Sequence, residues 1–146
     1  MTAQNDSEKL TSDGTKRDDQ TSMMPKEMIV ETDHTVTIAG REIAYRATAG
    51  TIVLKDNEQK AKASIFYVAY TKSDVGDLSQ RPLTIAFNGG PGSSSVWLHL
   101  GMLGPRRVHS GDVDHIQPPP YQLVDNEHSI LDITDLVFID PVSTGY

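Results

Sequence analysis

The residue types best suited to chemistry lie in one glycine-rich stretch. The segment Asn88-Gly89-Gly90-Pro91-Gly92 follows a short apolar run and precedes three serines, Ser93 to Ser95. Glycines at a tight turn leave backbone N–H groups open to close approach, and Pro91 stiffens the turn by fixing its own φ. Such N–H groups can hold an anion or a developing oxyanion. A glycine loop alone is weak evidence, and a purely structural turn between a strand and a helix is an equal alternative.

A second group of candidate ligands follows the glycine-rich stretch. His109, Asp112, Asp114 and His115 are residue types that bind metal ions. No single regular spacing places all four together, and they lie in a stretch flanked by glycine and proline that reads as a loop. We therefore expect no metal and no cofactor.

The spacing of apolar residues on either side of the glycine-rich stretch predicts its secondary structure. Residues 83–87 are apolar at four of five positions, which suits a strand buried on both faces, as in a parallel sheet. Val96, Leu100 and Leu103 follow at helical spacing, and any of the three serines can cap that helix. Gly104-Pro105 is a strong stop signal. We expect a strand, a tight loop and a helix, with a second buried strand at Leu136–Ile139.

The chain before this unit is rich in β-forming residues. Apolar and polar residues alternate on both sides of Gly40, from Thr35 to Arg46, and predict a hairpin with one solvated face. Further short strands are expected at residues 51–54 and 64–70. They are joined by a solvated turn at 55–60, and a polar loop covers 73–80. An antiparallel meander therefore leads into the first buried strand.

Three segments resemble the serine carboxypeptidase family, peptidase family S10. Residues 88–95 are similar to its Asn-Gly-Gly-Pro-Gly-Cys-Ser-Ser signature, and Leu103-Gly104-Pro105 follows at the family's spacing. Residues 136–146 are similar to its apolar strand followed by Asp-x-Pro-x-Gly-x-Gly-Phe/Tyr, without the residue between Asp140 and Pro141. The three matches occur in order and cover roughly residues 82–146, so the resemblance is specific.

The resemblance implies an α/β-hydrolase fold, of which this chain is the amino-terminal portion: a β meander, the first parallel strands and the oxyanion loop. It also implies a catalytic Ser, Asp and His in that chain order. The Gly-x-Ser-x-Gly motif of the nucleophile is absent, and the triad is expected beyond Tyr146. The full-length protein is then a serine carboxypeptidase acting on peptides with a free C-terminus, and this chain alone is inactive. A related esterase or acyltransferase, or a truncated binding module without catalysis, are the alternatives.

The same resemblance implies roles for individual residues. Gly90 matches the family position whose backbone N–H is one oxyanion donor, and Asn88 with the Gly89 N–H matches positions that hold the substrate's terminal carboxylate. The alternative for Asn88 is structural, with its side chain bonded to backbone. Asp140 and Gly145 match a second loop that shapes the pocket.

Several positions depart from the family pattern. Ser93 stands in place of the family's cysteine, and Ser143 in place of a glycine. Met102 stands where the family has a Glu that helps to bind the terminal carboxylate. A thioether cannot share a proton with an acid, so the preference for a C-terminal carboxylate is in question. Trp97 is expected to pack in the core.

Composition and charge limit the possible partners and location of the protein. Residues 1–25 are polar and are expected to be a disordered tail, and residues 26–146 form the incomplete hydrolase domain. The net charge of −7 disfavours nucleic acid or an anionic membrane as partner. No apolar run approaches the ~20 residues of a membrane-spanning helix, and no secretory signal is visible. The cytoplasm is the default expectation. Without the rest of the sheet, Leu136–Ile139 is expected to be an unpaired apolar edge.

Overall fold

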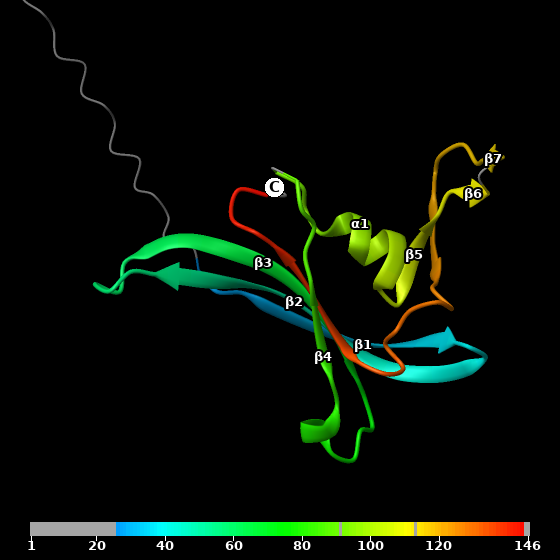
Figure 1. The fold of residues 1–146 in the computed structure, drawn as a ribbon, viewed down its shortest axis with the longest axis horizontal. Coiled ribbons are helices and arrows are strands. Elements are labelled where there is room, and N and C mark those ends of the chain that lie inside the picture. Colours follow the sequence, from blue (N-terminus) through cyan, green and yellow to red (C-terminus); the bar gives the residue numbers. More distant parts are fainter. Residues whose placement is uncertain (1–25, 91, 113, 145–146) are drawn as a thin grey trace, which may run out of the picture.

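The computed structural model describes residues 26–90, 92–112 and 114–144. They form a twisted five-stranded sheet with a helix against one face and a β arm that projects from one end (Figure 1). The tail predicted for residues 1–25 lies outside the described residues. The order of strands in the sheet is β1-β2-β3-β9-β4.

The predicted hairpin around Gly40 is confirmed. Strands β1 (Ile29–Ile38) and β2 (Arg41–Lys55) pair in antiparallel fashion, and Val36 lies opposite Ile43. The alternating apolar side chains near the turn are buried, and the polar side chains between them are exposed. Gly40 adopts φ +74°, a left-handed conformation that glycine tolerates without strain.

The separate strand expected at residues 51–54 is wrong, because these residues continue β2. Residues 41–50 of β2 pair with β1, while residues 45–55 pair with β3 (Ala61–Lys72), so the two pairings overlap and hold the strand together. Gly50 does not interrupt it. A Cβ at Gly50 would lie 2.8 Å from the Met28 carbonyl oxygen, so the position requires a residue without a side chain.

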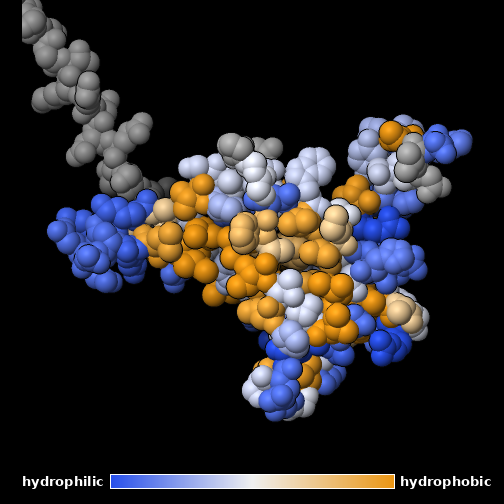
Figure 2. Space-filling view, viewed as in Figure 1, coloured by the Kyte–Doolittle hydropathy of each residue, from blue (hydrophilic) through white to orange (hydrophobic). Residues whose placement is uncertain are grey.

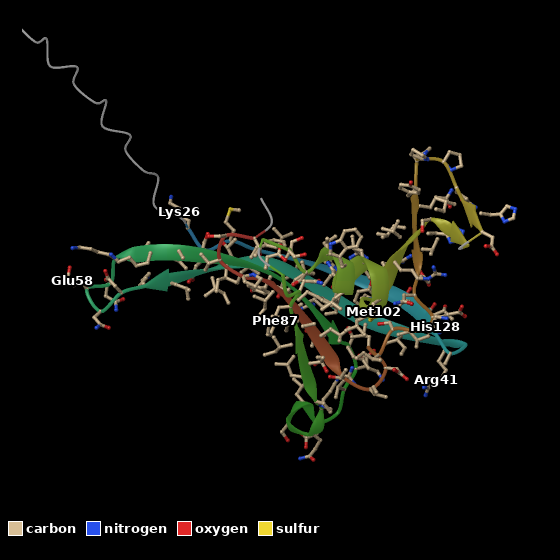
Figure 3. All side chains as sticks on the ribbon, turned by 45° about the horizontal axis from the view of Figure 1, so that its top comes forward. Lys26, Arg41, Glu58, Phe87, Met102 and His128 are labelled. Atoms are coloured by element: carbon tan, nitrogen blue, oxygen red, sulfur yellow. The ribbon has the colours of Figure 1, made fainter. Side chains whose placement is uncertain are left out.

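The turn between β2 and β3 is confirmed as a solvated turn. The Asp56 carboxylate accepts hydrogen bonds from the backbone N–H groups of Glu58 and Lys60, each at 2.9 Å. Figure 3 shows Glu58 at one end of the molecule and Arg41 at the other, which conveys the length of β2. The predicted polar loop at 73–80 contains one short 3₁₀ turn, Leu78–Gln80.

Strands β4 (Leu83–Ala86) and β9 (Asp135–Asp140) are parallel, as the apolar runs predicted. The unpaired edge expected at residues 136–139 is wrong, because β9 lies between β3 and β4 and pairs with both. The edge strand is β4 instead. Burial on both faces of β4 is also wrong: Leu83 is 61% exposed and Ile85 54%, since no described element covers those side chains. Figure 2, drawn from the same side as Figure 1, shows apolar side chains gathered over the middle of the molecule.

The predicted helix and its stop are confirmed, with a wider final turn. An α-helical turn, α1 (Val96–Leu98), passes into a π-helical turn (His99–Leu103) that ends when the Gly104 N–H donates to the His99 carbonyl at 3.0 Å. Leu98 and Leu103 pack against the core of the sheet. Trp97 points the other way and is 71% exposed, so the prediction that it packs in the core is wrong.

The stretch expected to be a loop after Pro105 is partly wrong, because it contains short strands. Strands β5 (Arg106–His109) and β8 (Gln122–Asp125) pair antiparallel, and β6 (Gly111–Asp112) and β7 (His115–Ile116) form a second ribbon at the end of the arm (Figure 1). The arm rejoins the body at Asn126, whose buried side chain donates to the carbonyls of Met102 and Gly104, both at 2.8 Å.

The core lies between the helix and the sheet. Its buried apolar members come from β1, β2, β3, β4, the segment before β9, and β9 itself: Val36, Ile38, Ile43, Tyr45, Tyr70, Ala86, Leu131, Leu136 and Phe138. A buried ion pair lies where β4 and β9 begin, and there Arg81 Nε is 2.7 Å from an Asp135 carboxylate oxygen.

Candidate functional site

The glycine-rich loop joins the carboxyl end of β4 to the start of α1, as predicted. Gly90 has φ +86° and Gly92 has φ +79°, both in the left-handed region that favours glycine. A Cβ added at Gly89 or Gly90 would meet no other atom within 4 Å. The backbone of these two residues is therefore open to approach by another molecule.

Asn88 holds the loop to the helix. Its Oδ1 accepts a hydrogen bond from the Leu98 backbone N–H at 3.3 Å. This contact is the structural role that was the alternative for this residue. The side-chain amide also carries two N–H donors on Nδ2, which are the groups suited to a carboxylate. The structural contact through Oδ1 is therefore compatible with ligand binding through Nδ2.

Ser95 fastens the end of the loop to β9. Its backbone N–H donates to an Asp140 carboxylate oxygen at 2.7 Å, and its hydroxyl donates to the Ile139 carbonyl. The Ser95 side chain is buried, and it does not cap α1. Asp140 thus connects the glycine loop to the segment that follows β9. Gly145, the other residue expected to shape the pocket, lies outside the described residues.

A cleft of about 1100 Å³ opens between the start of the helix, the sheet and the segment after β9. Figure 1 shows that segment beside the loop that precedes α1. The cleft walls carry hydroxyl, carboxylate, imidazole and apolar side chains: Thr51, Ser64, Phe66, Val68, Ser94, Ser95, Val96, His99, Phe138, Asp140, Pro141, Ser143 and Thr144. A cleft that combines apolar side chains with polar groups able to orient a ligand is suited to binding a small molecule.

Two titratable residues of this region were missed by reasoning from the sequence. The side chains of His99 and Tyr70 are hydrogen bonded, and the His99 ring stacks on Phe138 with 4.8 Å between centroids. Burial lowers the pKa of His99, and the nearby Asp140 opposes that effect in part. Burial raises the pKa of Tyr70, with a smaller contribution from Tyr45. The sequence did contain one signal for this pair, because His99 is a single histidine among the apolar residues of the predicted helix directly after the glycine loop.

The positions that depart from the family pattern have distinct surroundings. Ser143 adopts φ +66°, the left-handed conformation that a glycine would adopt with less strain. Met102 is 60% exposed, and Figure 3 shows it well separated from Phe87, where β4 meets the glycine loop. The Met102 side chain thus lies at the far end of the helix.

The residues of the β arm with metal-binding side chains lie on different short strands and in the turn between β6 and β7. Within the described part of the chain, no three His, Asp or Glu side chains lie close enough together to hold a metal ion. His109 ends β5 and His115 begins β7, while the Asp112 side chain lies outside what the structure describes.

Comparison with known proteins matches this architecture. The family model of the serine carboxypeptidases matches residues 42–146. This chain belongs to the serine carboxypeptidase family. The pheromone-processing carboxypeptidase of Saccharomyces cerevisiae is 36% identical over 103 residues, which cover 67% of this chain and 13% of that protein. The P-(S)-hydroxymandelonitrile lyase of Sorghum bicolor is 35% identical over 69 residues, covering 47% of this chain and 13% of that protein.

A solved structure supports the same fold. The crystal structure of a prohormone-processing carboxypeptidase from Saccharomyces cerevisiae superposes with a TM-score of 0.55 at 36% identity. The match covers 69% of this chain and 20% of that one. The serine carboxypeptidase resemblance read from the three motifs is therefore confirmed, and the α/β-hydrolase fold of the family is supported for this chain.

Among the described residues, no helix is both long enough and apolar enough to cross a lipid bilayer. The cytoplasmic location has no support from the structure and stays an expectation.

Proposed function

We propose that residues 26–146 are the amino-terminal part of a longer serine carboxypeptidase, which releases C-terminal residues from peptides. The observation that carries this proposal is the open, left-handed Gly90 turn between β4 and α1, in a chain that belongs to the family. In this mechanism a serine attacks the scissile carbonyl, a histidine takes its proton, and an aspartate orients the histidine. All three residues lie outside this chain.

The loop supplies the electrostatic part of the reaction. The Gly90 backbone N–H donates to the oxyanion that forms when the serine attacks, and one such donor contributes about 3 kcal/mol to lowering the barrier. The second donor follows the nucleophile and belongs to the rest of the protein. The Asn88 side-chain amide and the Gly89 N–H bind the terminal carboxylate, since both are donors to an acceptor-only group.

The chain by itself is inactive under this proposal. Ser95 donates its hydroxyl to a backbone carbonyl and is buried, so it is not an available nucleophile. Among the described residues, no histidine side chain is hydrogen bonded to the hydroxyl of Ser94 or Ser95, and the His99 ring is bonded to Tyr70 instead. A fluorophosphonate probe should therefore leave residues 93–95 unmodified, and labelling of any of the three serines would contradict the proposal.

The test of the proposed function uses the full-length protein and three N-blocked dipeptide substrates. One has a free C-terminus, one a C-terminal amide, and one an ester in place of the scissile amide. We expect hydrolysis of the free acid and the ester but slow hydrolysis of the amide. Asn88→Ala should raise KM for the free acid about tenfold while the exposed-turn control Asn57→Ala leaves it unchanged. Turnover of esters alone would exclude a peptidase.

A second candidate function is an ester- or cyanohydrin-directed reaction on the same scaffold. Met102 in place of the family's glutamate removes a carboxylate-binding group, and a relative at 35% identity is named a lyase. The same fold and the same oxyanion loop can support acyl transfer and related reactions as well as peptide hydrolysis. Under this alternative, Asn88 does not bind a terminal carboxylate, and the Asn88→Ala change would affect the free acid and the C-terminal amide alike. Absence of any turnover by the full-length protein would leave a non-catalytic binding module as the remaining account.

A further inference from the structure

One polar contact joins the helix of the site to the sheet beneath it. The Tyr70 hydroxyl on β3 is hydrogen bonded to Nε2 of His99, which begins the π-helical turn. Both side chains lie among apolar neighbours, because Tyr70 packs edge-on against Tyr45 and Phe138 and His99 stacks on Phe138. A polar pair in such surroundings fixes a geometry that apolar packing alone leaves loose.

The helix transmits this contact to the glycine loop. The His99 backbone N–H donates to the Ser95 carbonyl at 2.8 Å, and Ser95 ends the loop. The residue before His99, Leu98, donates its N–H to the Asn88 side chain at 3.3 Å. His99 is therefore linked to both ends of the loop. Its own N–H bonds to Ser95 at the end of the loop, and its neighbour Leu98 bonds to Asn88 at the start.

The His99 ring also faces the cleft. It lines the same cavity as Ser94, Ser95 and Asp140, on the side where the helix starts. Its Nε2 is engaged by Tyr70, so the ring is held in one orientation and is not a free proton acceptor at that atom. This arrangement suits a residue that sets the position of its neighbours.

We propose that Tyr70 and His99 are positioning residues. Their hydrogen bond fixes the distance between the glycine loop and the sheet, and so holds the Gly90 N–H where the oxyanion forms. This inference rests on the proposed function. A displacement of a donor by about 1 Å is enough to reduce turnover by a large factor. The pair should therefore affect kcat more than KM, because oxyanion stabilisation exists only in the transition state.

The test compares variants of the full-length protein on the free-acid dipeptide. Tyr70→Phe removes the hydroxyl and keeps the ring, and His99→Leu removes the partner. The matched control is Tyr67→Phe, which removes a hydroxyl from the same strand on its opposite face. We expect kcat to fall about five- to tenfold for either Tyr70→Phe or His99→Leu, with KM within twofold, and no change for the control. His99→Gln, which retains a side-chain N–H, should recover part of the loss.

Two further measurements separate positioning from simple packing. The double variant Tyr70→Phe/His99→Leu should be no slower than the slower single variant, because both changes remove one interaction. Hydrogen exchange of the peptide spanning residues 88–99 should become about fivefold faster in Tyr70→Phe and stay unchanged in Tyr67→Phe. Multiplicative kcat losses in the double variant would overturn the proposal, as would unaltered exchange in Tyr70→Phe.

The exchange measurement does not depend on turnover. If the wild-type protein hydrolyses neither peptides nor esters, the proposed function fails, and protection of residues 88–99 still decides whether Tyr70 holds the loop. If the wild-type protein is active and Tyr70→Phe matches Tyr67→Phe in both kcat and exchange, the inference fails while the proposed function stands.

Discussion

The substitution Asn126→Asp should destabilise this fold in a pH-dependent way. The Asn126 side chain is buried between the end of the helix and the segment before β9. Its Nδ2 donates to the carbonyls of Met102 and Gly104 at 2.8 Å, and its Oδ1 accepts from the His128 N–H at 3.2 Å. An ionised carboxylate keeps the acceptor and loses both donors, so two carbonyl oxygens then face a negative charge.

The expected loss of stability follows from the two hydrogen bonds that Asn126→Asp removes. Each lost hydrogen bond costs about 1 kcal/mol net, and each buried carbonyl left without a donor costs about 1–3 kcal/mol. We expect Asn126→Asp to lower the free energy of unfolding by about 3–4 kcal/mol at pH 7. Burial and the two carbonyls raise the pKa of the introduced carboxyl above about 3.9. The folded state then binds the proton more tightly than the unfolded state, so the loss shrinks as pH falls toward 4.5.

Urea denaturation of the full-length protein at pH 7 and pH 4.5, followed by circular dichroism, measures both quantities. Asn126→Ala removes all three side-chain hydrogen bonds without adding charge, and it should cost about 2–3 kcal/mol at both pH values. Asn57→Asp, in the exposed turn, is the matched control and should stay within about 0.5 kcal/mol of wild type. If Asn126→Asp equals the control, or becomes less stable relative to Asn126→Ala at pH 4.5, the reasoning is refuted.

Three further outcomes are expected. Asp135→Ala should lower the free energy of unfolding by about 3 kcal/mol in urea titrations, because it leaves the buried Arg81 guanidinium without its ion pair. Gly104→Ala should destabilise by more than about 2 kcal/mol, since its Cβ would lie 2.3 Å from a backbone oxygen. By contrast, Gly101→Ala, with open space, should stabilise the helix by up to about 1 kcal/mol. Burial lowers the pKa of His99, so the unfolded state binds the proton more tightly. Stability should therefore fall as pH decreases below about 6.5, and His99→Leu should reduce that slope.

Local pattern in the sequence predicted most of the individual elements. The alternation around Gly40 determined the β1–β2 hairpin, because one-residue shifts would expose Val36 and Ile43. The Gly104-Pro105 stop and the glycine loop were equally local features, each set by the conformations that those residues allow. Membership of the serine carboxypeptidase family was also readable from the three motifs.

Errors arose where the outcome depended on a distant partner. Residues 51–54 looked like a separate strand because their continuity with β2 comes from overlapping pairing with β1 and β3. Trp97 is hydrophobic and was expected inside, yet Leu98 and Leu103 occupy the helix face that meets the sheet. Side-chain type does not reveal which face a neighbouring layer will cover.

The sequence by itself determined the loop, because the left-handed conformations of residues 90 and 92 favour glycine. It also determined the hairpin and the family. Only the tertiary structure decided that β9 enters between β3 and β4, which makes β4 the edge strand. Only the tertiary structure placed Tyr70 against His99 and Asp140 against Ser95. These contacts join residues 29 and 45 positions apart, and no local rule of propensity or spacing acts over such distances.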